Sequence, residues 1–157
     1  MRHPVSPKLY GSFFTWTLQE GWQAELGTTG TAQIAYVRAL FELRRWHDLI
    51  PDQADAVVSP GYGTYASDGS VNDSDYVTAA ATADGTLAIA YLPTSRTVTV
   101  EMSKFAGTVT ARWYDPASGG YLTVPGSPFD NSGARQFSPP GLNSDGDDAW
   151  ILLLEVN

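Results

Sequence analysis

The carboxylates of the N-terminal third are the residues best suited by type to hydrolytic chemistry. Glu20 and Glu25 lie in a stretch of loop-like composition, and Asp48 and Asp52 follow a predicted helix. Two such groups can act together as a general acid and a general base. The alternative is that all four are solvated charges. Glu20 and Glu25 are kept as candidate substrate contacts.

Histidine and cysteine offer little further chemistry in this sequence. The chain has no cysteine, which excludes a thiolate nucleophile, a disulfide and a cysteine-ligated zinc site. Its two histidines are His3 and His47, and only His47 has an adjacent acid, Asp48. Neighbours on a helix do not face each other, and no nucleophile-elbow motif is present. We therefore expect His47 to be a packing residue rather than a base.

The run 113–116 (WYDP) is the most specific motif of the chain. The structural interpretation is a strand that ends in a turn. The Asp115 side chain closes the turn with local hydrogen bonds, and the proline fixes the backbone φ angle that the turn needs. In functional terms its rings could form a platform for a sugar ring or a proline-rich ligand. Trp113 alternates onto the apolar face of its strand, so we expect it in the core. Arg112 and Tyr114 share the opposite face as surface candidates, and with Trp113 they form the candidate ligand-binding group.

Two acidic runs resemble calcium loops by composition. Residues 143–148 (NSDGDD) lack the twelve-residue spacing and the terminal glutamate of an EF-hand. We expect a polar hairpin there, with structural calcium as the alternative, and interpret the run 68–75 in the same way. The sequence therefore predicts neither a metal site nor a cofactor.

An amphipathic helix is predicted over residues 31–46, and Pro51 stops the pattern. Its broad apolar face consists of Ile34, Val37, Leu40, Phe41 and Leu43. Arg44 falls on the same arc, so it must extend its charge to solvent or find an acidic partner. Residues 9–17 have the composition of a strand. Residues 1–53 are therefore predicted to form a strand–loop–helix unit, as in α/β folds.

Residues 54–157 are predicted to form an antiparallel β-sandwich. Turn signals separate short runs that alternate in polarity. The predicted strands are 76–82, 86–92, 97–102, 108–114, 121–124, 134–137 and 149–156. Residues 150–154 are apolar on both faces, as expected of a central strand.

The net charge and the hydropathy of the chain exclude some classes of binding partner. The net charge of −8, without an arginine or lysine cluster, disfavours binding to nucleic acid. The apolar runs are far shorter than the roughly 18 residues needed to span a bilayer, so no membrane partner is expected. The N-terminal segment lacks the pattern of a signal peptide.

Five motifs together resemble one family. In order along the chain they are YGSFFTW, GTAQIAYVRALFELRRWHDLIPD, YLP, ARWYDPASGGY and DDAWILLLEV. They resemble the C-terminal part of the apiosidase-like glycoside hydrolases, which are (β/α)₈ barrels that carry a C-terminal β-sandwich. That sandwich is known as the "putative collagen-binding domain of a collagenase". The resemblance covers nearly the whole chain.

The resemblance implies an incomplete barrel before the sandwich. Residues 11–16 would be its eighth strand and residues 31–46 its eighth helix, so that 1–53 is the last βα unit. Family members usually read E-S-R-P-W-W at the helix end. Here Glu42, Arg44 and Trp46 keep that pattern, whereas Leu43, Arg45 and His47 depart from it.

The same resemblance bears on the chemistry. Glu20 and Glu25 would lie on the side of the barrel where active sites form. The paired catalytic carboxylates would lie on earlier strands, so no catalytic residue carries over to this chain. The chain would then be a fragment of a secreted glycoside hydrolase, with the missing barrel as its partner.

Three functions remain open. The first is a non-catalytic accessory module that stabilises the barrel and helps to hold a polysaccharide. The second is a module that binds collagen or another protein, and the third is a hydrolase with an unrecognised site. A purely structural role predicts an exposed apolar patch where the barrel would sit, and with it self-association.

Overall fold

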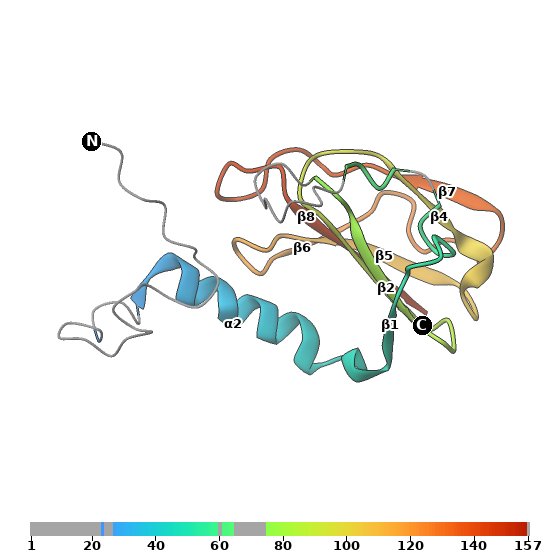
Figure 1. Cartoon of the computed structure of the whole chain (residues 1–157), viewed down its shortest axis with the longest axis horizontal. Helices are drawn as coiled ribbons and strands as arrows, with labels where there is room; N and C mark the ends of the chain where they lie inside the picture. The colour runs from blue at the N-terminus through green and yellow to red at the C-terminus, as the bar shows by residue number, and fades with distance from the viewer. Residues whose placement is uncertain (1–22, 24–26, 60, 65–74, 157) are drawn as a thin grey trace.

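The computed structural model, which describes residues 23, 27–59, 61–64 and 75–156, is a β-sandwich with one helix on the outer face of its larger sheet (Figure 1). The helix is α2 (Thr29–Glu42), and 3-10 turns lie at Trp46–Asp48 and Met102–Lys104. The strands are β1 (Leu49–Pro51), β2 (Thr78–Thr82), β3 (Leu87–Leu92), β4 (Val98–Glu101), β5 (Val109–Tyr114), β6 (Tyr121–Thr123), β7 (Ala134–Phe137) and β8 (Trp150–Val156). Six of them form an antiparallel sheet in the order β1-β2-β3-β8-β5-β6, and β4 pairs with β7 in a second sheet. The predicted mainly β sandwich is confirmed.

The seven predicted strands correspond to β2 through β8, with ends that agree within two residues. The sequence pattern did not reveal β1, which has only three residues and ends in Pro51. This strand pairs with β2 at the edge of the sheet, with Leu49 opposite Thr82. A proline is tolerated at such an edge because no further strand needs its missing N–H.

The central position predicted for residues 150–154 is confirmed, because β8 lies between β3 and β5. Trp150, Leu152 and Leu154 point into the core between the two sheets. Ile151 and Leu153 point to the opposite face, beneath α2. All five side chains are buried, so β8 contributes to both apolar layers of the molecule.

The helix contacts the sheet through a narrower face than the sequence predicted. Leu40 is fully buried, whereas Ile34, Val37 and Leu43 are 53%, 43% and 89% exposed. The broad apolar face was therefore wrong for these three residues. Only a narrow strip of a helix meets a flat sheet, and here the strip follows Tyr36, Leu40 and the residues beside them.

The end of the helix also differs from the prediction. Helix α2 stops at Glu42 instead of continuing to Trp46, and a 3-10 turn at Trp46–Asp48 leads directly into β1. The guanidinium of Arg44 donates to the carbonyl of Leu40, which satisfies one of the free carbonyls at the helix end. The chain can then enter the edge of the sheet without a long loop.

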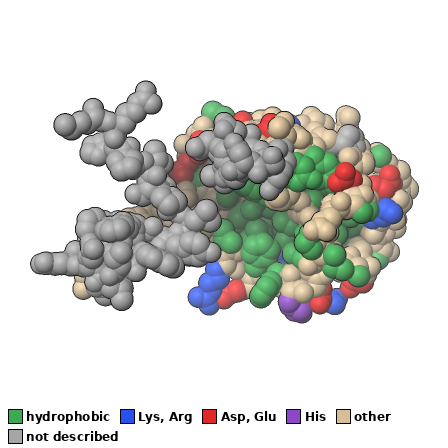
Figure 2. All heavy atoms as spheres, viewed as in Figure 1, with side chains coloured by type: hydrophobic (Ala, Val, Ile, Leu, Met, Phe, Trp, Pro, Cys, Tyr) green, Lys and Arg blue, Asp and Glu red, His purple; other side chains and the backbone are tan. Residues whose placement is uncertain are grey.

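Apolar surface remains open beside the helix. Figure 2 shows hydrophobic side chains gathered over the six-stranded sheet next to α2. The exposed apolar residues of α2 and of the segment after it add to this surface. In the described part of the chain, no helix is both long and apolar enough to cross a membrane.

Several expectations concern residues outside the described ranges. These are the strand at 11–16, the candidate contacts Glu20 and Glu25, and most of the acidic run 68–75.

Candidate functional site

Two of the three candidate ligand residues of β5, Trp113 and Tyr114, are buried, and Arg112 is partly exposed. Tyr114 is 1% exposed, so the exposure expected for it was wrong. Its hydroxyl donates to the backbone carbonyl of Tyr36 at 2.6 Å, which ties β5 to α2. Trp113 is 3% exposed and lies in the core between the sheets, as expected. The alternation of the strand was predicted correctly, but the sequence did not show that α2 covers its second face.

Arg112 belongs to a group of four residues that we call the arginine–glutamate cluster: Arg44, Arg112, Tyr121 and Glu155. Arg44 Nε lies 2.9 Å from Glu155 Oε1, and Arg112 pairs with Oε2 of the same carboxylate. The Arg44 and Arg112 guanidinium carbons lie 5.7 Å and 5.0 Å from the centre of the Tyr121 ring. One carboxylate therefore joins β5, β8 and the segment that follows α2. Of the two alternatives for Arg44, solvent or an acidic partner, the structure shows the second.

The WYDP motif forms the turn that its sequence predicted. Asp115, 7% exposed, accepts hydrogen bonds from the amide of Ala117 at 2.8 Å and the hydroxyl of Ser118 at 2.8 Å. It also accepts the amide of Ser144 at 3.1 Å, which fastens the 143–148 loop to this turn. Gly119 completes the turn at a φ of 75°, where a side chain would be strained. The motif therefore organises two loops.

Acidic pH should weaken the fold through Asp115. Burial raises the pKa of its carboxyl, but the hydrogen bonds from Ser118, Ala117 and Ser144 outweigh burial and hold the pKa below its ordinary value. A group whose pKa is lowered by folding stabilises the fold above its unfolded pKa, about 4 for aspartate. That stability is lost as the pH falls from there through the folded pKa.

The measurement is urea unfolding of the parent chain and of Asp115→Ala between pH 7 and pH 2. At pH 7 the variant should lose roughly 1–2 kcal/mol, because several partly buried donors lose their acceptor. Its loss relative to the parent should shrink as the pH falls below about 4. The matched control is Asp130→Ala, an exposed aspartate, which should change little at any pH. A loss that is constant across this range would contradict the prediction.

The acidic loop 143–148 is a hydrogen-bonded hairpin in this structure. Asn143 Oδ1 accepts the amides of Asp145 and Asp147, both at 3.0 Å. The Asp145 carboxylate accepts a hydrogen bond from Gln33 on α2, and Asp148 accepts the amide of Ser95. These carboxylates point to different partners. Within the described ranges, no three His, Asp or Glu side chains come together as a possible metal site.

A charged depression of about 410 Å³ lies where α2 leads into the sheet. Arg45 lies 2.6 Å from Asp48 and 2.8 Å from Asp84, and both carboxylates line the depression. Hydrogen bonds from Thr82 and Thr86, and then Arg45, hold the pKa of Asp84 far below its ordinary value. A glycosidase needs one protonated carboxyl as its acid, so Asp84 is poorly suited to that role. His47 Nε2 lies 3.7 Å from Asp48, beyond hydrogen-bond distance.

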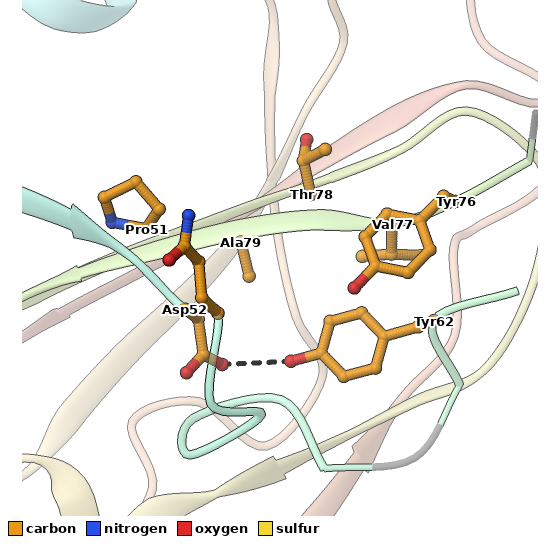
Figure 3. A pocket seen from close by; sticks show the side chains of 8 residues that line it. Pro51, Asp52, Tyr62, Tyr76, Val77, Thr78 and Ala79 are labelled. Carbon is orange, nitrogen blue, oxygen red and sulfur yellow. Dashed lines mark hydrogen bonds between the residues drawn. The ribbon is translucent and has the colours of Figure 1, made fainter. Parts of the chain in front are cut away.

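A second depression, which we call the tyrosine pocket, has a volume of about 180 Å³ (Figure 3). It is lined by Pro51, Asp52, Gln53, Tyr62, Tyr76, Val77, Thr78 and Ala79. The two tyrosine rings stack with centroids 5.3 Å apart and planes 18° from parallel. Both phenol oxygens lie on the side of the ring pair that faces Asp52. Aromatic edges, a carboxylate, an amide and a hydroxyl thus meet in one place.

The pocket arises because the edge strand β1 is short. The Asp52 amide still donates to Ala79 on β2 at 2.8 Å, but beyond it the chain turns away. Tyr62 returns to the same edge, where its carbonyl accepts the amide of Val77 at 2.7 Å. The pocket lies between these two backbone contacts.

Asp52 holds the loop that brings Tyr62 back. Its carboxylate accepts the amides of Ala56, Val57 and Val58 and the hydroxyl of Tyr62, the last at 3.0 Å. Burial raises the pKa of Asp52, but these hydrogen bonds outweigh burial and keep the pKa below its ordinary value. Asp52 is therefore ionised at neutral pH and places a negative charge at the pocket.

The sequence reasoning missed this pocket. The sequence offers Asp52 only as a possible acid or base, and no pattern in it singles out the tyrosines. One signal was available: Tyr62 stands between Gly61 and Gly63, which both have positive φ, at 107° and 79°. Glycines on both sides of an aromatic residue are typical of a loop that presents its ring in a fixed direction.

Comparisons with known proteins identify a family for this chain and solved structures with a similar fold. Residues 64–155 match the profile of the family described as "Putative collagen-binding domain of a collagenase". A structure titled "Glycoside hydrolase" aligns over 87% of this chain at 22% identity and a TM-score of 0.67. A glycoside hydrolase family 5 structure from Bacteroides vulgatus ATCC 8482 aligns over 85% of it at 20% identity and a TM-score of 0.66. The alignments cover 27% and 26% of those chains. No curated protein sequence matches the chain.

Proposed function

This chain belongs to the family described as "Putative collagen-binding domain of a collagenase", and we propose that it is a non-catalytic accessory module of a glycoside-hydrolase-like protein. It would stabilise the catalytic barrel and help to hold a polymeric substrate outside the cell. Two structural neighbours titled as glycoside hydrolases, of whose length this chain spans about a quarter, support this proposal.

In this proposal, residues 1–53 are the last βα unit of the barrel and residues 54–157 are the accessory sandwich. The family match begins at residue 64, so α2 lies outside it, whereas β1 already pairs with β2 of the sandwich. Helix α2 is nevertheless fastened to the sandwich through Leu40 and the arginine–glutamate cluster. Arg112 and Tyr114 then serve as packing residues of the joint, and Trp113 packs in the core of the sandwich.

One observation carries the proposal. Helix α2 buries one side against the sheet, while the apolar side chains of Ile34, Val37 and Leu43 remain exposed. The sheet therefore covers only part of the broad apolar face of the helix, and exposed apolar side chains that gather in one place mark an interface. The neighbouring strands and helices of a barrel would supply the other side of that interface.

The test is to incubate the purified chain with insoluble plant polysaccharides and, in parallel, with fibrillar collagen. We expect depletion of the chain from solution by at least one polysaccharide and no release of reducing ends. Depletion by collagen alone would favour a protein-binding module. Release of reducing ends, proportional to the amount of chain, would contradict a non-catalytic role. Bovine serum albumin serves as the control for non-specific adsorption.

A further inference from the structure

We propose that the tyrosine pocket binds one sugar residue of a neutral polysaccharide chain. This inference rests on the proposed function and names the site where the module would hold its substrate. None of the residues that line the pocket belongs to the candidate ligand group of β5 or to the arginine–glutamate cluster.

The lining of the pocket matches the two kinds of surface that a sugar ring presents. A pyranose has apolar C–H faces and a rim of hydroxyl groups that both donate and accept hydrogen bonds. Pro51 and Ala79 supply apolar contacts in the pocket, while the Gln53 amide supplies a polar group that can both donate and accept. Gln53 is an exposed residue, and its side chain has no hydrogen-bond partner within the described part of the chain.

The polar wall of the pocket is held in place before any ligand arrives. Tyr62 donates to Asp52, and its hydroxyl also contacts the carbonyl of Val58. Asp52 is in turn held by three backbone amides of its own loop. A site whose groups are already positioned loses less conformational entropy on binding.

The stacking of the rings favours a sugar over a proline-rich strand. Proline-rich ligands dock against the open faces of aromatic side chains. Here Tyr62 and Tyr76 stack with centroids 5.3 Å apart, so the facing sides of the rings are covered by each other. The pocket instead meets the hydroxyl-bearing side of the pair (Figure 3). Hydroxyl groups of a ligand find more partners there than a proline ring does.

Charge excludes an acidic polymer as the main ligand. The ionised Asp52 lines the pocket, and the chain carries a net charge of −8. No arginine or lysine side chain lines the pocket. A polymer of uronic acids would therefore be repelled, whereas a neutral chain of hydroxyl-rich sugars would not.

The location also suits a long ligand. The pocket lies at the edge of the six-stranded sheet, past the point where Pro51 ends β1. A polymer bound there can extend away from the module in both directions. That geometry would let the module hold one link of a chain while a catalytic barrel acts elsewhere on it.

The test compares the variant Gln53→Ala with the parent chain in calorimetric titrations of cellohexaose, xylohexaose and mannohexaose. The replaced side chain is exposed, so the variant should keep the unfolding temperature of the parent. Loss of the hydrogen bonds that the amide donates and accepts should weaken binding at least roughly tenfold. The matched control is Gln136→Ala, which removes the same exposed residue type from β7. It should bind like the parent.

The possible outcomes separate this inference from the proposed function. If the parent binds an oligosaccharide and the pocket variant binds it equally well, the pocket assignment is wrong and the accessory function stands. If the parent binds neither these oligosaccharides nor an insoluble polysaccharide, the pocket assignment and the substrate-holding role both fail. If a collagen-like peptide of Pro-Hyp-Gly repeats binds and the pocket variant loses it, the ligand is protein and the sugar assignment is overturned.

Discussion

Replacement of Glu155 by glutamine should lower the free energy of unfolding by roughly 2–3 kcal/mol. The Glu155 carboxylate is the shared partner of Arg44 and Arg112, and the Arg44 side chain is only 8% exposed. Without the negative charge of Glu155, the guanidinium groups of Arg44 and Arg112 remain close together with no compensating charge. The expected loss is smaller than the roughly 3–5 kcal/mol that follows when one partner of a fully buried ion pair is removed. The reason is that the Arg112 side chain is still 33% exposed.

The control for this prediction is Glu42→Gln, which breaks the ion pair between Glu42 and Arg38 on the outer side of α2. Those side chains are 54% and 74% exposed, so the loss should stay below about 0.5 kcal/mol. Chemical unfolding of both variants at low and moderate salt provides the comparison. Equal losses in the two variants would contradict a structural role for the arginine–glutamate cluster.

Replacement of Leu40 by alanine should cost roughly 2–4 kcal/mol in the stability of the docked helix. Leu40 is the one fully buried side chain of α2 and packs against Leu87, Ile89, Ile151 and Leu153. Its truncation leaves a cavity at the centre of this contact. We expect α2 to detach before the sandwich unfolds, because the core between the two sheets does not include this residue.

Amide hydrogen exchange distinguishes the two events. In Leu40→Ala, protection should fall in α2 while β3, β5 and β8 keep most of theirs. Val37→Ala is the matched control, since Val37 is 43% exposed on the same helix. It should leave the protection of both regions nearly unchanged. Equal loss of protection in α2 and in β8 would mean that helix and sandwich form one cooperative unit.

Local pattern was enough to predict the sandwich because each strand carries its own signal. Residues 150–154 are apolar at every position, and a strand of this kind needs an apolar layer on each of its faces, as in the covered middle of a sheet. The position of α2 on the sheet has no such local signal. Ile34 and Val37 fit an apolar stripe as well as Leu40 does, and which of them is buried depends on the sheet that the helix meets. The pairing of Arg44 could be anticipated, but the identity of Glu155, 111 residues away, could not.

The candidate site was harder to predict than the fold. Arg112 and Tyr114 alternate with the core residues of β5, which is compatible with a surface position in a two-layer sandwich. The third layer formed by α2 changes the outcome, because it covers that face. The tyrosine pocket depends on the early end of β1, a strand of three residues. Whether three residues form a strand depends mainly on the strand beside them, so the sequence carries almost no local signal for β1.

The place of β8 has a consequence for the way this module is synthesised. Residues 150–156 come last among the strands, yet β8 separates β3 from β5 in the middle of the six-stranded sheet. Before β8 has been synthesised, β1, β2 and β3 could pair with one another, and so could β5 and β6. The two groups would then lack the strand that joins them. Neither group has its central partner, and open apolar edges invite association with other nascent chains. The six-stranded sheet can therefore be completed only after β8 has been translated. A chaperone that shields the nascent chain until then would reduce its aggregation.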